Sequence, residues 1–256
     1  MNRIALLIVL VASVATFVGC PKKQTVGMPD YDILVAQDGS GDYTSIQDAI
    51  DDASDGDLIY VKAGVYEEEV EIEDRDDINL MGAGPDRAII DADDEYAAVT
   101  LASDGCRLSG FTLANASSHG VYLKDGHHSI HRCLITDNGD RGIYFTSFSG
   151  DPSASIDHCT IVENDVSGIY SPTDHRKTSI TNCIIADNGR GIVSDDDEGN
   201  MRIDYNCVYE DGSEFDRVTE GKGNIIEDPE YDGDFRLEPG SPCIGAASDG
   251  TNMGCF

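Results

Sequence analysis

Residues 130–143 read IHRCLITDNGDRGI, residues 156–169 read IDHCTIVENDVSGI, and residues 180–192 read ITNCIIADNGRGI. An earlier copy, LSGFTLANASSHGV at 108–121, has phenylalanine where the others have cysteine, and a later copy begins at Ile203 and then decays. The copies recur roughly every 22 to 26 residues, and a short period of this kind indicates a solenoid.

The pattern within each copy has the periodicity of strands. Its apolar positions are isolated, are separated by polar residues and recur in pairs about two residues apart, whereas no stripe of 3.6-residue period is present. A copy of this length holds about three short strands with their bends, and each strand must pair with its equivalent in the next copy. We therefore expect an all-β, single-domain solenoid whose parallel sheets close around a core.

Two residue types recur at fixed positions of the copies. Asn138, Asn164 and Asn188 are expected at bends, because asparagine tolerates left-handed backbone and its amide can bond the asparagine above and below. The recurring cysteines are expected to stack inside as free thiols, because in-register side chains lie about 4.8 Å apart, beyond disulfide reach. They are Cys133, Cys159 and Cys183. Cys106 and Cys207 lie outside this column and are left unassigned.

The repeat resembles the right-handed parallel β-helix of the pectate-lyase and polygalacturonase superfamily, including its asparagine ladder. The resemblance implies this fold for residues 31–256, and implies little about chemistry because the motif is structural. The ending GDFRLEPGSPCIGA at 233–246 is similar to the last coil of bacterial β-helix lipoproteins. That similarity implies a disulfide between Cys243 and Cys255, with two buried free thiols as the alternative.

Residues 31–72 predict a cap for the first coil. Four apolar residues between Ile46 and Ala53 follow helical spacing, and Thr44 with Gln47 has the spacing of a capping box. A short α-helix here would cover exposed strand edges. The stretch resembles the N-terminal cap of pectin methylesterases, but that family's catalytic motifs, such as Q-D-T-L and L-G-R-P-W, do not occur in this chain. We therefore expect no methylesterase activity.

The N-terminus predicts a lipid anchor. Arg3 precedes an apolar run that ends near Cys20, and the run suits a signal peptide (residues 1–20) better than a membrane-spanning helix. A cysteine at this place resembles a bacterial lipoprotein cleavage site, which implies a lipid on Cys20. Residues 21–30 would be a tether, and Pro21 in place of aspartate favours the outer membrane or the cell surface.

The composition excludes some partners. Seventeen Lys and Arg against 49 Asp and Glu give a net charge of −32, which excludes nucleic acid as a partner, because phosphate contacts need a basic face. The same charge works against anionic polysaccharides unless a local basic patch or a bound cation intervenes. We expect the chain to be a monomer.

One outward strand face carries residues suited to sugars. Tyr122, Tyr144 and Tyr170 should stack on it, and the residues flanking the neighbouring glycines are His119, Arg141 and Arg190. Aromatic rings bind sugar faces and arginine binds carboxylates, so this face is a candidate polysaccharide-binding site. The alternative is that tyrosine is an ordinary strand former on an outer surface.

The loops after these strands supply about one carboxylate per coil. These are Asp125, Asp151, Asp174 and Asp195. In pectate lyases Ca²⁺ is held by aspartates and an Arg or Lys acts as base, so the resemblance implies a possible calcium site with Arg141 or Arg176 as proton acceptor. The alternative is that these acidic loops are only solvated.

The histidines match no standard metal-ligand spacing. His127, His128 and His131 are expected on the surface. The segment IDH at 156–158 resembles part of a pectate lyase, but the wider motif is absent. The sequence thus favours an envelope-anchored β-helix lipoprotein that binds a polysaccharide. A calcium-dependent lyase or hydrolase and a purely structural envelope protein remain the alternatives.

Overall fold

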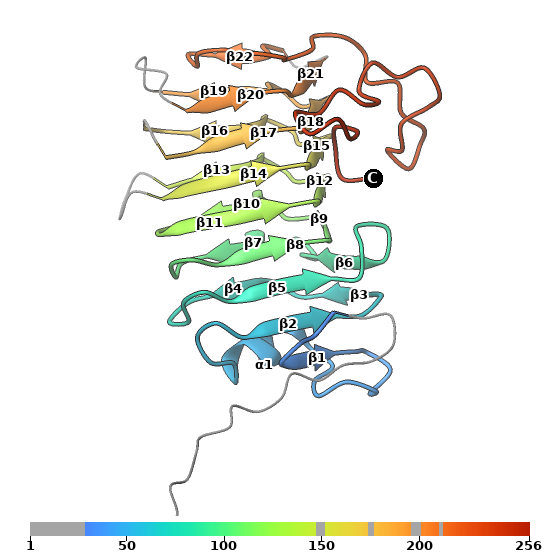
Figure 1. Cartoon of the computed structure of the whole chain (residues 1–256). Helices are drawn as coiled ribbons and strands as arrows, with labels where there is room; N and C mark the ends of the chain where they lie inside the picture. Colours follow the sequence, from blue (N-terminus) through green and yellow to red (C-terminus); the bar gives the residue numbers. More distant parts are fainter. Residues whose placement is uncertain (1–28, 147–151, 174–176, 196–200, 210–211) are drawn as a thin grey trace, which may run out of the picture.

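A computed structural model describes residues 29–146, 152–173, 177–195, 201–209 and 212–256. They form a right-handed parallel β-helix, capped at its N-terminal end by one short α-helix (Figure 1). The predicted fold class is confirmed. The expected signal peptide lies outside the described residues, and so does most of the tether. Within the described part, no helix has the length and apolar character needed to cross a membrane.

Three parallel sheets run along the solenoid, each made of equivalent strands from successive coils. The first sheet contains β1 (Ile33–Val35), β2 (Leu58–Val61), β5 (Asn79–Gly82), β8 (Arg107–Ser109), β11 (His127–His131), β14 (Ser153–Asp157), β17 (Ser179–Thr181) and β20 (Arg202–Asp204). The second contains β3 (Gly64–Glu67), β6 (Ala88–Asp91), β9 (Thr112–Ala114), β12 (Leu134–Thr136), β15 (Thr160–Val162), β18 (Ile184–Ala186) and β21 (Cys207–Tyr209). The third contains β4 (Val70–Ile72), β7 (Ala97–Leu101), β10 (His119–Leu123), β13 (Arg141–Phe145), β16 (Ser167–Ser171), β19 (Ile192–Ser194) and β22 (Phe215–Asp216).

The inward positions of the repeat pair in register and fill the core. Ile130 pairs with Ile156, which pairs with Ile180, and all three side chains are fully buried. The residues beside them on these strands point outward and are partly exposed. The alternation of apolar and polar residues therefore fixes which face of each strand meets the core.

The asparagine ladder forms as predicted, but the left-handed residue is a different one. The Asn138 amide donates to Asn164 Oδ1 at 2.9 Å, and the Asn164 amide donates to Asn188 Oδ1 at 2.9 Å. The positive φ angles fall one residue earlier, at Asp137 (55°) and Glu163 (57°). The expectation of left-handed asparagines is therefore wrong: the preceding residue makes the turn, and this frees the asparagine side chain to point inward.

The recurring glycines allow two coils to approach closely. A Cβ atom on Gly142 would lie 2.5 Å from Cγ2 of Ile161 and 2.6 Å from the carbonyl oxygen of Gly168. Both separations are far below a normal contact, so no larger residue fits at this position.

The cysteine column also forms as predicted. Cys133, Cys159 and Cys183 are fully buried free thiols. The predicted bridge between Cys243 and Cys255 is wrong: both are buried free thiols, which was the alternative. The reason is their position: Cys243 lies beside Cys207, whereas Cys255 lies near Cys133 and Cys159 of the column.

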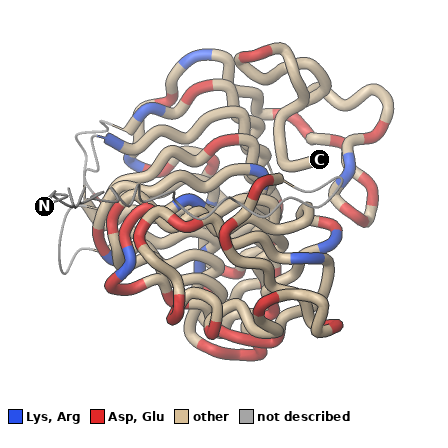
Figure 2. The backbone as a smooth tube through the Cα atoms, turned by 60° about the horizontal axis from the view of Figure 1, so that its bottom comes forward, with Lys and Arg blue, Asp and Glu red and all other residues tan. Residues whose placement is uncertain are grey.

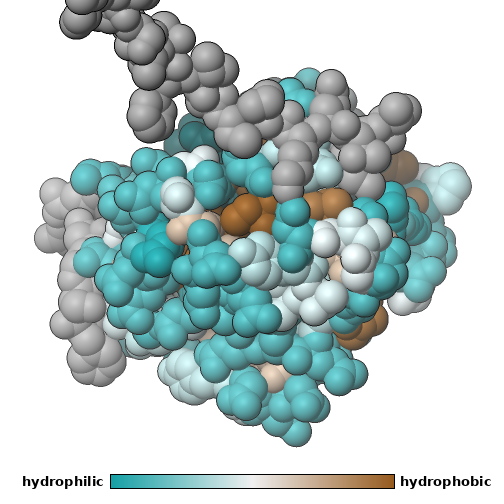
Figure 3. All heavy atoms as spheres, turned by 90° about the horizontal axis from the view of Figure 1, so that it is seen from below, coloured by the Kyte–Doolittle hydropathy of each residue, from teal (hydrophilic) through white to brown (hydrophobic). Residues whose placement is uncertain are grey.

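The cap helix α1 (Ile46–Asp51) lies across the open end of the first coils, as predicted, and buries Ile46, Ala49 and Ile50. Its N-cap is Ser45 rather than Thr44, so the predicted capping box is wrong by one residue. Seen from this end in Figure 3, the surface is mostly hydrophilic, with a smaller hydrophobic area near its centre.

The last residues form a segment that we call the C-terminal strap, residues 241–256. It packs on the outer face of the second sheet (Figure 1), where Met253 and Cys255 join an apolar cluster with Leu134, Val162 and Ile184. The strap therefore covers an outward face that carries apolar residues and would otherwise meet water.

Candidate functional site

A continuous row of aromatic rings lies on the outer face of the third sheet. Tyr122, Tyr144 and Tyr170 occupy equivalent positions of β10, β13 and β16. Their ring centroids are 5.4 Å and 5.8 Å apart, so the predicted outward stack is confirmed. Tyr96 extends it, with its ring centroid 5.7 Å from that of Tyr122. These four tyrosines together with His119 are called the aromatic strip below.

Sequence reasoning missed Tyr96. It immediately precedes β7 and is 48% exposed, the most accessible tyrosine of the strip. Because it lies in an earlier coil with a weak repeat, no periodic signal marks it. Its position becomes evident only when β7 and β10 are placed side by side.

His119 is not the exposed cation that the sequence suggested. It is 1% exposed and lies beneath the rings of Tyr96 and Tyr144, with centroid distances of 5.2 Å and 4.5 Å. Burial, and secondly the charge of Arg141, lower the pKa of His119 to about 4. The imidazole is therefore neutral at pH 7 and supports the strip by packing.

Arg141 lies within the strip. Its guanidinium carbon is 5.1 Å from the ring centroid of Tyr144 and 4.3 Å from that of Tyr170, in cation–π contact with both. Its Nη1 also forms an ion pair with Asp140. Burial raises the pKa of Asp140, although the Arg141 charge opposes that shift. The arginine thus holds the two rings in place while a carboxylate neutralises it.

Arg190 is neutralised in the same way. Its Nη1 lies 3.2 Å from the Asp216 carboxylate of β22. Both predicted arginines are therefore already paired with a carboxylate, which reduces the net positive charge that each presents to an acidic sugar.

The predicted calcium ligands do not form one site. Asp151, Asp174 and Arg176 lie outside the described residues. Asp125 and Asp195 follow strands that are three coils apart, roughly 14 Å at the ~4.8 Å spacing of paired strands, too far to bind one ion. Asp195 instead accepts a hydrogen bond from the Tyr170 hydroxyl.

Asp125 lines a hollow of about 760 Å³ at the turns between the third and first sheets. Most of its other charged residues are acidic, among them Glu73, Asp76 and Asp104. Figure 2 shows Asp and Glu on many of the turns around the coil, and far fewer Lys and Arg. The acidic composition is therefore a property of the turns, whereas the aromatic strip lies on a strand face.

The first sheet carries a second hollow, which sequence reasoning did not identify. It encloses about 670 Å³ and is lined by Met81, Arg107, Ser129 and His131 among others. The alternation within β11 was the available signal, because it sends His127, Ser129 and His131 outward. His128 points inward and is 1% exposed, so the prediction of three surface histidines is wrong for that residue.

The comparisons agree with this architecture. A family model described as "Right handed beta helix region" matches residues 94–233, more than half of the chain, and the chain therefore belongs to that family. A second model, described as "Pectinesterase", matches residues 32–115, which include the capped end. The fold is thus a pectin-methylesterase-like β-helix.

The similar proteins match this chain over only part of their own length. "Putative pectinesterase/pectinesterase inhibitor 38" of Arabidopsis thaliana is 30% identical over an alignment of 128 residues, which covers 44% of this chain and 26% of that protein. "Pectinesterase/pectinesterase inhibitor PPE8B" of Prunus persica is 41% identical over an alignment of 64 residues, which covers 23% of this chain and 12% of that protein. The chain spans about a quarter or less of these relatives.

Two solved structures are similar to this chain in fold. Pectate lyase Pel9A has a TM-score of 0.49 at 14% identity, covering 88% of this chain and 95% of that one. The pectin methylesterase from carrot has a TM-score of 0.44 at 18% identity, covering 84% and 80%.

Proposed function

We propose that this chain is an envelope-anchored β-helix protein that binds a polysaccharide along the aromatic strip and has no pectin methylesterase activity. The row of tyrosines that runs across four successive coils, with each ring in contact with the next, carries this proposal. Such a row offers one ring face or edge per coil, and aromatic rings pack against the apolar faces of sugars. The pectinesterase names of the relatives support a polysaccharide as the ligand.

The charges around the strip favour an uncharged or esterified chain over a polyanion. Arg141 and Arg190 are each paired with an aspartate, and the whole chain carries a net charge of −32. A polyanion would meet like charge, including the carboxylates of Asp140 and Asp216 beside the two arginines. Binding would therefore rest on ring contacts, with a small dependence on salt.

The lyase alternative has less support. Arg141 is 20% exposed, is already bound to Asp140 and lies against two tyrosine rings, so its access to a sugar proton is poor. Arg176 is outside the described residues. The absence of pectin methylesterase motifs, seen in the sequence, argues against that activity.

The test is a binding measurement on the purified protein with esterified pectin, pectate and a neutral glucan. We expect Tyr144→Ala to weaken binding by roughly 2- to 10-fold, which corresponds to the loss of one ring contact of about 0.5–1.5 kcal/mol. Tyr60→Ala is the matched control, since Tyr60 points outward from the first sheet. Equal binding by both variants, or binding to none of the three polymers, contradicts the proposed site.

The envelope anchor is tested separately by fractionation. We expect the full chain to incorporate a fatty-acid label and to sediment with membranes, and Cys20→Ser to abolish both. A Cys20→Ser protein that keeps its label shows that the anchor is elsewhere.

A further inference from the structure

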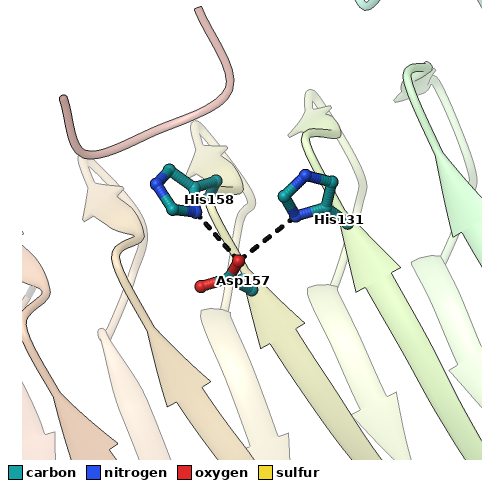
Figure 4. A group of neighbouring side chains, drawn as sticks. All are labelled: His131, Asp157 and His158. Carbon is teal, nitrogen blue, oxygen red and sulfur yellow. Dashed lines mark hydrogen bonds and ion pairs between the residues drawn. The ribbon is translucent and has the colours of Figure 1, made fainter. Parts of the chain in front are cut away.

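Two histidines converge on one carboxylate at the turn between the first and second sheets. Nδ1 of His131 lies 3.2 Å from Oδ2 of Asp157, and Nδ1 of His158 lies 2.9 Å from the same oxygen (Figure 4). One ligand atom from each residue falls within 4.8 Å of the others. In the part of the chain that the structure describes, no other group of three His, Cys, Asp or Glu residues is this compact.

Asp157 and His158 are each held by a second contact. Oδ1 of Asp157 accepts hydrogen bonds from Thr181 Oγ1 at 2.9 Å and from Asn182 Nδ2 at 2.7 Å, which leaves Oδ2 for the histidines. Nε2 of His158 lies 2.9 Å from Thr251 Oγ1 of the C-terminal strap. Metal-binding histidines and carboxylates are typically oriented by outer contacts of this kind.

The protons at His158 can be assigned from its neighbours. Thr251 Oγ1 lies 2.6 Å from Oδ1 of Asp249 and must donate its proton to that carboxylate. The hydroxyl therefore accepts from His158, and Nε2 of His158 carries a proton. If the imidazole is neutral, its Nδ1 presents a lone pair to the Asp157 oxygen at 2.9 Å, which is repulsive.

This arrangement needs a positive charge between His158 and Asp157. A second proton on His158 would supply one, and so would a metal ion. Oδ2 of Asp157 faces the Nδ1 atoms of both imidazoles, while Oδ1 accepts its two hydrogen bonds from Thr181 and Asn182. A cation between the rings would therefore meet a carboxylate oxygen.

We propose that His131 Nδ1, His158 Nδ1 and Asp157 Oδ2 form a binding site for Zn²⁺ or a similar divalent transition metal. Two imidazoles and one carboxylate are a donor set that suits this class of ion, and a three-residue set leaves a fourth position open. The side chains of His131 and Asp157 are 41% and 30% exposed, so an ion can reach the site from solvent, and the acidic protein attracts cations.

The site also joins distant parts of the chain. His131 and Asp157 end adjacent strands of the first sheet, and His158 follows Asp157, whereas Thr251 belongs to the strap. An ion that binds the folded arrangement and not the unfolded chain stabilises the fold. Metal binding should therefore raise the melting temperature of the whole protein.

The experiment measures Zn²⁺ binding by calorimetry and the melting temperature with and without Zn²⁺, on the full-length protein. We expect one Zn²⁺ per chain and a higher melting temperature. His131→Gln should weaken binding by at least 10-fold, and Thr251→Val by about 10- to 100-fold, as is typical when an outer contact is lost. His127→Gln, on the outer face of the same strand, is the matched control and should bind as the wild type does.

Co²⁺ serves as a spectroscopic probe, because the chain also contains cysteines. We expect visible d–d bands of a nitrogen- and oxygen-bound ion, without the near-ultraviolet charge-transfer band of a thiolate. A thiolate band, no binding, or His131→Gln binding like wild type would each overturn the proposal. If His158 instead carries protons on both nitrogens in the presence of excess Zn²⁺, as read by ¹⁵N NMR, the charge is a proton and the site is not a metal site.

Discussion

At the scale of single residues, the ladder asparagines have the most demanding role. The side chain of Asn164 accepts from Asn138, donates to Asn188, and also donates to the carbonyl oxygens of Ile135 (3.2 Å) and Val162 (3.0 Å). It is 1% exposed, so no water can replace these bonds. One amide thus satisfies groups that belong to three coils.

We expect Asn164→Ala to lower the free energy of unfolding by about 2–4 kcal/mol, because it leaves several buried polar groups without partners at about 1–3 kcal/mol each. Urea denaturation measures the change. Asn79→Ala, at an outward strand position, is the control and should change the free energy by less than about 0.5 kcal/mol. A loss for Asn164→Ala no larger than this control would mean that the ladder is not stabilising.

The same turn shows a limit of sequence reasoning. The repeat identified the ladder asparagines correctly, because their spacing is visible. The left-handed residue beside them is Asp137 in one coil and Glu163 in the next, and the other turn uses residues such as Arg132 and His158. Aspartate and histidine are enriched at positive φ, whereas glutamate and arginine are not, so residue type marks the turn in some coils and not in others. At Glu163 and Arg132 the closure of the coil imposes the conformation without a local signal in the sequence.

At the scale of elements, the cap helix depends on a residue that is distant in sequence. Glu68, which follows β3, accepts from the backbone N–H groups of Ile46 (2.8 Å) and Gln47 (3.0 Å) and from the hydroxyl of Ser45 (2.8 Å). The helix has only six residues and would not be stable alone. Periodicity predicted the helix, but its cap comes from the next strand connection, which a local pattern cannot show.

We expect Glu68→Ala to lower the free energy of unfolding by about 1–2 kcal/mol, since it removes a charged acceptor from a helix N-terminus. Denaturant titration followed by circular dichroism measures this. Glu67→Ala tests the specificity of the effect, because Glu67 is adjacent and exposed. Should both variants lose the same stability, the effect would come from the surface charge and not from the cap.

At the scale of the whole molecule, the solenoid stacks like charges. Asp137, Glu163 and Asp187 occupy the same turn position in successive coils. Burial, then the charges of Asp137 and Asp187, raise the pKa of Glu163 above its ordinary value of 4.5. Because the pKa of Glu163 is raised on folding, the folded state binds more protons than the unfolded state. Glu163 therefore lowers the free energy of unfolding as the pH rises from its unfolded pKa through its folded pKa.

Replacing Glu163 with glutamine should therefore raise the free energy of unfolding more at neutral pH than at acidic pH. We expect the urea midpoint of Glu163→Gln, relative to wild type, to be higher at pH 7 than at pH 4. Glu220→Gln is the control for general charge effects, because Glu220 is exposed and does not belong to the stacked acidic residues. If the gain in urea midpoint from Glu163→Gln did not increase with pH, the stacked acidic side chains at this turn position would not repel one another.

The aromatic strip shows how much of a site the repeat can predict. Its three in-register tyrosines were predictable, because equivalent positions must stack. The pairing of Arg141 with Asp140 and the burial of His119 were not, since both depend on how side chains pack against neighbouring coils. His131 and Asp157 occupy the same position of successive copies, so their pairing was predictable too, whereas the turn that brings His158 to the same carboxylate was not.

The C-terminal strap changes how the coils open. Coils in a solenoid contact only their neighbours, so such a protein can unzip from one end, a coil at a time. Here the strap contacts several coils: the N–H of Cys255 donates to Thr160 Oγ1 at 3.1 Å, and the N–H of Ser248 donates to Asn182 Oδ1 at 2.7 Å. These coils cannot part without releasing the strap, so the middle and the C-terminal end of the molecule open as one cooperative block.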